Sequence, residues 1–269
     1  MKSWLLRPLL DLKELLKRQD SVSALIGNIR SLDMLRNKMR DIHDLERLVS
    51  RVMAEVSNPR EILALRDSLR VVPAIQKMIH PYNSERISEI QCELDPMEDV
   101  VTLIETAISD SPPVSVNEPG IIRSGYSYEL DELRDIRASG RKFITSLESK
   151  ERERTGIQSL KIKFNNVFGY FIEVTKANLS LVPDHYLRKQ TLVNCERFVT
   201  GELQEYEEKI LRAEERIHSL ENEIFTQLRK YVGIHGRRIQ KTARLLGEDL
   251  YPTRPAPGCG IAESAFYSQ

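Results

Sequence analysis

The stretch that decides the fold is residues 151–212, which read ERERTGIQSLKIKFNNVFGYFIEVTKANLSLVPDHYLRKQTLVNCERFVTGELQEYEEKILR. Apolar and polar residues alternate along 160–165 and again along 170–175, the period-two pattern of strands. Residues 165–169 (NNVFG) join these runs, and Asn and Gly tolerate the backbone conformations of tight turns. A third run, 191–200, also alternates. We therefore expect a small antiparallel sheet.

Two long predicted helices frame this sheet. The first runs from about Tyr128 to Arg154, with Gly140 as a weak point. Its expected inward residues are Leu130, Leu133, Ile136, Ile144 and Leu147. In the second, apolar residues from Leu203 to Ile224 step alternately by three and four between charged flanks, and we expect the helix to continue to about Tyr231. So narrow a seam favours an antiparallel, coiled-coil-like pair over a helix lying on a globular core.

The remaining sequence is mostly helical in pattern. Residues 9–80 read as consecutive amphipathic helices, Asp44 opens one of them, and Asn58 before Pro59 fits an N-cap followed by the first helical residue. Another helix starts at Asp95-Pro96, and 111–120 is a loop. The fold class is therefore mainly α: a helical core with a long two-helix pair that carries a small antiparallel β insert.

Bulk composition excludes several classes of protein. The 269 residues hold 40 Lys and Arg against 40 Asp and Glu, so the net charge identifies no partner. Three distant cysteines without CxxC spacing argue against a disulfide framework or a zinc site. No apolar stretch approaches a membrane span, and charges interrupt the N-terminal leucines too early for a signal peptide. We expect a cytoplasmic protein with no membrane partner.

Catalytic signatures are missing from the sequence. The five histidines are scattered without metal-ligand spacing, and no GxSxG or GxxxxGK[ST] motif occurs. The many acidic residues fit solvated helix faces. We therefore expect no catalytic residue, no metal site and no cofactor in this chain, which is not an enzyme by itself.

The insert between the long helices is locally basic, with six Lys and Arg against three Asp and Glu along 161–197. Cations that displace counterions, beside amides and hydroxyls that bond phosphate oxygens, suit the DNA backbone and read no sequence. The candidate contacts are Lys161, Lys163, Asn165, Asn166, Arg188, Lys189, Gln190, Thr191 and Asn194. We expect Arg188 and Lys189 to contribute most. From charge alone, a solvated sheet face is an equal alternative.

Several segments of the sequence resemble one protein family. Residues 152–198 (RERTGIQSLKIKFNNVFGYFIEVTKANLSLVPDHYLRKQTLVNCERF) resemble the clamp of the MutS DNA mismatch-repair proteins. IHDLERLVSRV (42–52) and NPREILALRDSL (58–69) resemble the family's helical core, ELQEYEEKIL (202–211) its lever, and RIQKTARLLGE (238–248) the stretch that follows. The resemblance covers roughly residues 2–248. Cys195 and Gly201 depart from it, where we expect a small aliphatic residue and a proline.

The resemblance implies a domain plan. Residues 1–127 form the helical core, 128–154 and 201–248 the lever helices, and 155–200 the β clamp insert. Residues 249–269 form a tail outside the family pattern, which we expect to be disordered because it lacks periodicity and is rich in Pro, Gly and Ser.

The resemblance also implies a function. The full-length family uses ATP and Mg. It also recognises a mispair through a Phe-x-Glu motif in an N-terminal domain. Residues 171–173 match that motif, but they lie in a predicted clamp strand, so a chance match is the better explanation. We expect a truncated piece without mismatch-recognition and ATPase domains that binds the backbone of duplex DNA. A homodimer, or a partner polypeptide supplying the ATPase, stays open. The alternatives are a coiled-coil interaction or structural protein, and a non-functional product of a broken gene.

Overall fold

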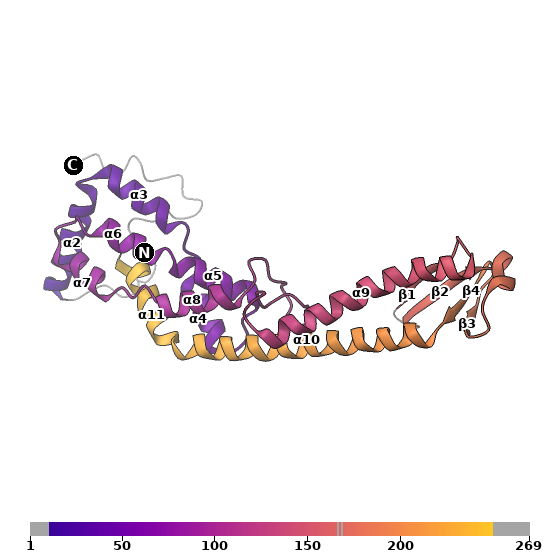
Figure 1. The fold of residues 1–269 in the computed structure, drawn as a ribbon. Coiled ribbons are helices and arrows are strands. Elements are labelled where there is room, and N and C mark those ends of the chain that lie inside the picture. The colour runs from indigo at the N-terminus through magenta and orange to yellow at the C-terminus, as the bar shows by residue number, and fades with distance from the viewer. Residues whose placement is uncertain (1–10, 166, 168, 250–269) are drawn as a thin grey trace. The chain divides into compact units, whose positions relative to one another are not determined.

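A computed structural model describes residues 11–165, 167 and 169–249 (Figure 1). The described part of the chain divides into two compact units: the first holds residues 11–123 and 224–249, and the second lies within residues 124–223. The described part is mainly helical and carries a small antiparallel sheet, which confirms the expected fold class. The domain boundaries drawn from the sequence stay a prediction.

The first unit is built from helices around an aliphatic core. Its elements are α2 (Leu12–Ile26), α3 (Ile29–Met39), α4 (Leu45–Met53), α5 (Pro59–Leu69), α6 (Val72–Ile79), α7 (Glu85–Glu93), α8 (Glu98–Ala107), α11 (Gly236–Arg244) and the π-helical η2 (Leu245–Asp249). Side chains such as Leu48, Ile62 and Ile104 are almost fully buried. Each such side chain contributes roughly 1.5–3 kcal/mol relative to an exposed one.

Several helix starts lie where the sequence predicts them. At α5, the Asn58 side chain accepts the Glu61 N–H at 2.9 Å, and the Glu61 carboxylate accepts the Asn58 N–H at 3.0 Å. Asp44 caps α4 by accepting the Arg47 N–H. The helix expected from Asp95-Pro96 begins later, at Glu98, because Asp95 first accepts the Met97 N–H and closes a turn.

The expected tail lies almost wholly outside the described residues. Only Asp249, where η2 ends, belongs to the described part of it. Residues 9 and 10 of the expected N-terminal helices also fall outside.

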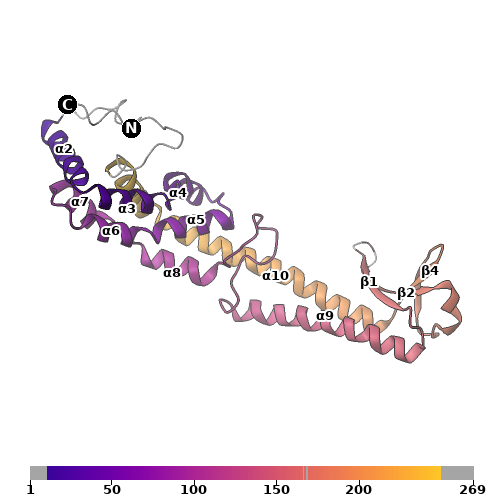
Figure 2. The same ribbon diagram turned by 90° about the horizontal axis from the view of Figure 1, so that it is seen from above.

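The second unit is organised by two antiparallel helices, α9 (Tyr128–Thr155) and the part of α10 (Gly201–Ile234) up to Glu223 (Figure 2). The predicted seam of α10 is buried at Leu203, Ile210, Ala213, Ile217 and Leu220. Across the pair, the rings of Phe143 and Tyr206 stack with centroids 3.5 Å apart. The expectation for Ile136 was wrong, because 42% of this residue is exposed. Gly140, not Ile136, occupies the buried position on that part of α9.

The sheet contains β1 (Lys161–Asn165), β2 (Gly169–Thr175), β3 (Leu187–Thr191) and β4 (Cys195–Val199) in the order β1-β2-β4-β3, all antiparallel; the 3-10 helix η1 (Lys176–Leu181) follows β2. The third run, expected over 191–200, is confirmed as a strand only at β4, and its expected start was wrong. β3 ends at Thr191, and the Leu192 N–H donates to the Cys195 carbonyl to close a turn before β4. β3 escaped detection because it is a polar edge strand with little apolar alternation.

Two further findings concern the described residues alone. None of the helices within 11–165, 167 and 169–249 is long and apolar enough to cross a membrane. The same residues contain no group of three or more His, Cys, Asp or Glu side chains placed to hold a metal ion. The cytoplasmic location stays a prediction.

Candidate nucleic-acid interface

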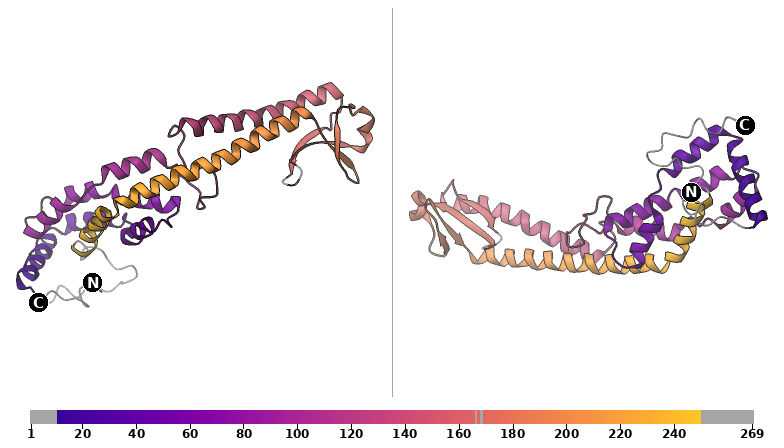
Figure 3. Two further views of the ribbon diagram at one scale, coloured as in Figure 1. Left: turned by 90° about the horizontal axis from the view of Figure 1, so that it is seen from below. Right: turned by 180° about the vertical axis from the view of Figure 1, so that it is seen from behind.

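The sheet packs one of its faces against α9 and α10 (Figure 3). Ile172 and Phe198 from the sheet join Leu147 of α9 and Leu203 of α10 in one buried cluster. Because side chains alternate along a strand, every second residue of the sheet points away from this cluster. We call that opposite surface the outer face.

Polar groups from both helices fix the β1–β2 hairpin. Glu148 of α9 accepts the Ile162 N–H at 2.7 Å, and Glu207 of α10 accepts the Tyr170 N–H at 3.1 Å. Gly169, which ends the turn with a φ of 70°, leaves room for Glu207, since a Cβ there would overlap its carboxylate. The turn expected at 165–169 is confirmed at this glycine.

A buried carboxylate holds the segment before β3. Glu151 of α9 is 4% exposed and accepts hydrogen bonds from the Tyr186 hydroxyl and from Arg154. Burial, and then the hydrogen bond to Glu151, raise the pKa of the Tyr186 hydroxyl well above its usual range. Arg154 also lies 2.7 Å from a ring nitrogen of His185. The end of α9 and the chain entering β3 are therefore tied together.

A polar row crosses all four strands on the outer face. The registers place Lys161 opposite Glu173, Glu173 opposite Arg197, and Arg197 opposite Gln190. Directly opposite residues share a face of the sheet. Lys163, which lies opposite Phe171, reaches into the row, and its Nζ is 2.7 Å from Glu173. We call Lys161, Lys163, Glu173, Arg197 and Gln190 the outer row.

Arg197 is the best-held cation of the outer row. Its guanidinium lies 4.2 Å from the centroid of the Phe171 ring and donates to the Gln190 side-chain oxygen at 2.8 Å. Stacking on an aromatic ring orients a guanidinium at little entropic cost. Arg197 and Glu173 are not among the nine residues expected from the sequence to contact DNA. Extending the alternation on either side of Phe198 and Ile172 would have found both.

The nine candidates do not form one surface. Lys161, Lys163 and Gln190 belong to the outer row, whereas Thr191 lies opposite Glu196 on the other face. Arg188 lies opposite Phe198, and its Nε is 2.8 Å from the Glu196 carboxylate, which is buried.

The remaining candidates lie in turns or irregular positions. Lys189 is exposed at the bulge between Arg188 and Gln190. Asn165 accepts the Val167 N–H within the β1–β2 turn, and Asn194 is exposed in the β3–β4 turn. Asn166 falls outside the described residues. These positions leave the phosphate-contacting role of each residue a prediction.

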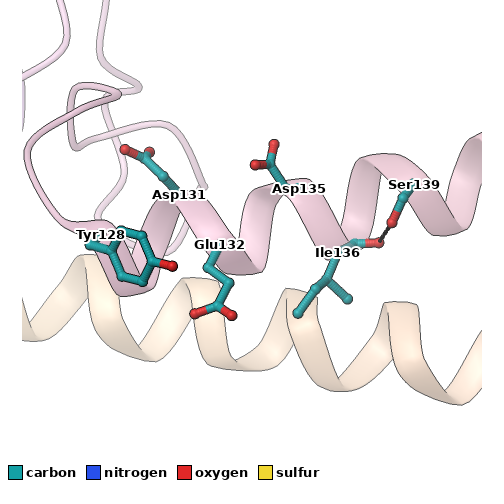
Figure 4. A pocket seen from close by; sticks show the side chains of 6 residues that line it. All are labelled: Tyr128, Asp131, Glu132, Asp135, Ile136 and Ser139. Atoms are coloured by element: carbon teal, nitrogen blue, oxygen red, sulfur yellow. Dashed lines mark hydrogen bonds between the residues drawn. The ribbon is translucent and has the colours of Figure 1, made fainter.

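A shallow hollow on α9 offers a different surface (Figure 4). It is lined by Tyr128, Asp131, Glu132, Asp135, Ile136 and Ser139. Three carboxylates and no cation make this lining unfavourable for a phosphate backbone. The outer face is therefore the better candidate for nucleic acid.

Comparison with known proteins identifies the second unit. The family model described as MutS family domain IV matches residues 125–216. These residues contain α9, the whole sheet and the start of α10, so the matched region includes the outer row.

Similarity to individual proteins extends over most of the chain. The chain is 47% identical to the DNA mismatch repair protein MutS of Symbiobacterium thermophilum over 248 residues. This aligned length is 92% of this chain and 28% of that protein. Identity is 42% to the MutS of Clostridium novyi and 46% to that of Methanothrix thermoacetophila, each over 91% of this chain and 27% or 29% of the relative. The chain thus spans less than a third of the length of these curated relatives. The resemblance to MutS drawn from the sequence is therefore confirmed: the second unit matches MutS family domain IV, and most of the chain is similar to one part of longer DNA mismatch repair proteins.

Proposed function

We propose that the outer face binds the phosphate backbone of duplex DNA, as the clamp of a MutS-type mismatch-repair protein. The observation that carries this proposal is the outer row itself. Its cations Lys161, Lys163 and Arg197 lie on the sheet face opposite the buried cluster, within the region that matches MutS family domain IV.

The chemistry of the row suits phosphate and not bases. Lysine and arginine displace counterions from the duplex, and the Gln190 amide can donate to a phosphate oxygen. Such contacts position DNA without reading sequence. We therefore propose binding that is indifferent to base sequence and to a mispair.

The wider activity of the relatives is also a proposal for this chain. These proposals are mismatch repair, the use of ATP and Mg, and a homodimer or a partner polypeptide that supplies an ATPase. Each of them would need protein segments beyond the matched region. We propose no nucleotide binding by the chain itself, because its sequence holds no GxxxxGK[ST] loop. Saturable ATP binding in calorimetry would contradict this.

Duplex binding can be tested by fluorescence anisotropy with one outer-row charge removed. K161Q should weaken binding to a short matched duplex severalfold and reduce the salt slope by roughly one. The matched control is K77Q, the same change at an exposed position of α6. A coiled-coil protein without a nucleic-acid role predicts no salt-sensitive binding in any of the three proteins.

A further inference from the structure

One carboxylate lies inside the cationic outer row. Glu173 Oε1 is 2.7 Å from Lys163 Nζ, and Glu173 Oε2 is 3.8 Å from Arg197 Nε. The Glu173 side chain is only 21% exposed, so both interactions are partly shielded from water. Lys161, opposite Glu173 in the register, forms no ion pair with any residue in the described parts of the chain.

This arrangement places an anion where a DNA phosphate would bind. A phosphate that approaches Lys163 meets a cation whose charge is already matched at hydrogen-bonding distance. It must displace Glu173 or share the ammonium with it, and two anions at one site repel each other. Lys161 requires no such exchange. The ammonium group of Lys161 is therefore available to a phosphate, whereas that of Lys163 is already paired.

We infer that Glu173 is a built-in competitor for the DNA backbone, which holds Lys163 and Arg197 in position and lowers the affinity of the outer face for phosphate. The inference rests on the proposed function and extends it. Glu173 contacts the binding cations and sets how strongly they bind. Lys163 is released from it only when phosphate takes its place.

Charge arithmetic sets the expected effect. Lys161, Lys163 and Arg197 carry three positive charges and Glu173 one negative charge, a net of +2. E173Q raises this net charge to +3 and keeps an oxygen that can accept from Lys163. One further phosphate contact would steepen the plot of log affinity against log salt by roughly 0.9.

The first test compares E173Q with E215Q by anisotropy on one matched duplex. Glu215 is exposed on α10, in the same compact unit, and its side chain forms no ion pair or hydrogen bond with the described residues. E215Q therefore makes the same change of charge away from the outer face. E173Q should bind several times more tightly than the unchanged chain, with a steeper salt slope, and E215Q should stay close to it. Equal effects of both changes would overturn the inference, because bulk charge would explain them.

The second test is a double-mutant cycle with K163Q. Loss of Lys163 should cost little affinity in the unchanged chain and distinctly more in E173Q, where Lys163 is free to contact phosphate. Additive effects would contradict the inference. K163Q should also cost less affinity than K161Q in the unchanged chain, and this comparison holds even if E173Q does not fold. An equal or larger cost for K163Q would overturn the inference.

Failure of the inference is distinguishable from failure of the proposed function. If the unchanged chain and E173Q both lack salt-sensitive duplex binding, the proposed function is wrong and the inference falls with it. If the unchanged chain binds duplex and E173Q, with an intact far-UV circular dichroism spectrum, binds no more tightly, the inference alone is wrong.

Discussion

Gly140 of α9 lies so close to Ile210 of α10 that a Cβ added to the glycine would be 2.6 Å from Ile210 Cγ1. Real Cβ atoms do not approach other carbons this closely. The glycine therefore permits the close crossing of the two helices that support the sheet.

We predict that G140A destabilises the protein although alanine is the better helix former. Overpacking costs about 1–3 kcal/mol, which outweighs the roughly 0.5–1 kcal/mol gained from helix propensity. Urea unfolding followed by circular dichroism measures the difference. S139A, the exposed neighbour, is the control and should change stability little. In an I210A background G140A should cost less, and a gain in stability from G140A alone would show that the crossing is loose.

Tyr186 should contribute to stability through its hydrogen bond to Glu151. Y186F leaves that buried carboxylate with Arg154 and removes a charge-assisted bond, so we expect a loss of roughly 1–3 kcal/mol. Y126F removes a hydroxyl from a residue that is 39% exposed and should be nearly neutral. Equal unfolding midpoints for Y186F and the unchanged chain would contradict the role given to this bond.

The raised pKa of Tyr186 also predicts a dependence on alkaline pH. In the unfolded chain tyrosine ionises near pH 10, whereas folded Tyr186 keeps its proton to higher pH. The unfolded state therefore binds fewer protons above about pH 10, and stability falls as pH rises there. The contribution is fully present below that pH. Stability measured from pH 8 to 11 should fall less steeply in Y186F, and parallel curves would disprove the assignment.

Arg188 and Glu196 should respond unequally to mutation. R188A leaves the Glu196 carboxylate, whose side chain is 7% exposed, without its cation, whereas E196Q leaves an arginine side chain that is 62% exposed and can be hydrated. We expect R188A to cost about 1–3 kcal/mol, less than for a fully buried pair, and E196Q to cost less. A larger loss in E196Q, measured by urea unfolding, would reverse the argument.

This asymmetry affects the prediction that Arg188 and Lys189 contribute most to DNA binding, which stays a prediction. The R188A/K189A variant should weaken duplex binding and flatten its salt dependence. Because R188A also uncovers Glu196, the double change is best made in an E196Q chain. Unchanged binding in that folded triple variant would remove both residues from the interface.

Local sequence patterns predict most of the fold. The seam of α10 and the N-cap at Asn58 follow from local sequence alone, and the structure confirms both. Ile136 was predicted to face inward because apolar periodicity does not count glycine as an inward residue. In the structure Gly140 sets the helix crossing, since it has no side chain to keep the helices apart. β3 was missed because its partner is β4, and pairing at an edge leaves little apolar alternation in the strand itself.

The candidate site was predictable in composition and not in arrangement. The basic residues of the insert were evident, but register decides which of them share a face, and register is a property of strand pairs. Counting charges also treated Lys163 and Arg188 as available cations. The structure pairs them with Glu173 and Glu196, which no count could assign.

Binding of the DNA backbone by the outer face can be measured directly in a salt titration. Affinity of the unchanged chain is measured by anisotropy on two duplexes that differ only in a G·T mispair, across a range of salt concentrations. We predict a linear fall of log affinity with log salt, of slope about −2 to −3 for two or three phosphate contacts, and equal affinity for both duplexes. A flat salt dependence, or a clear preference for the mispair, would show that the outer face does not bind the DNA backbone in this way.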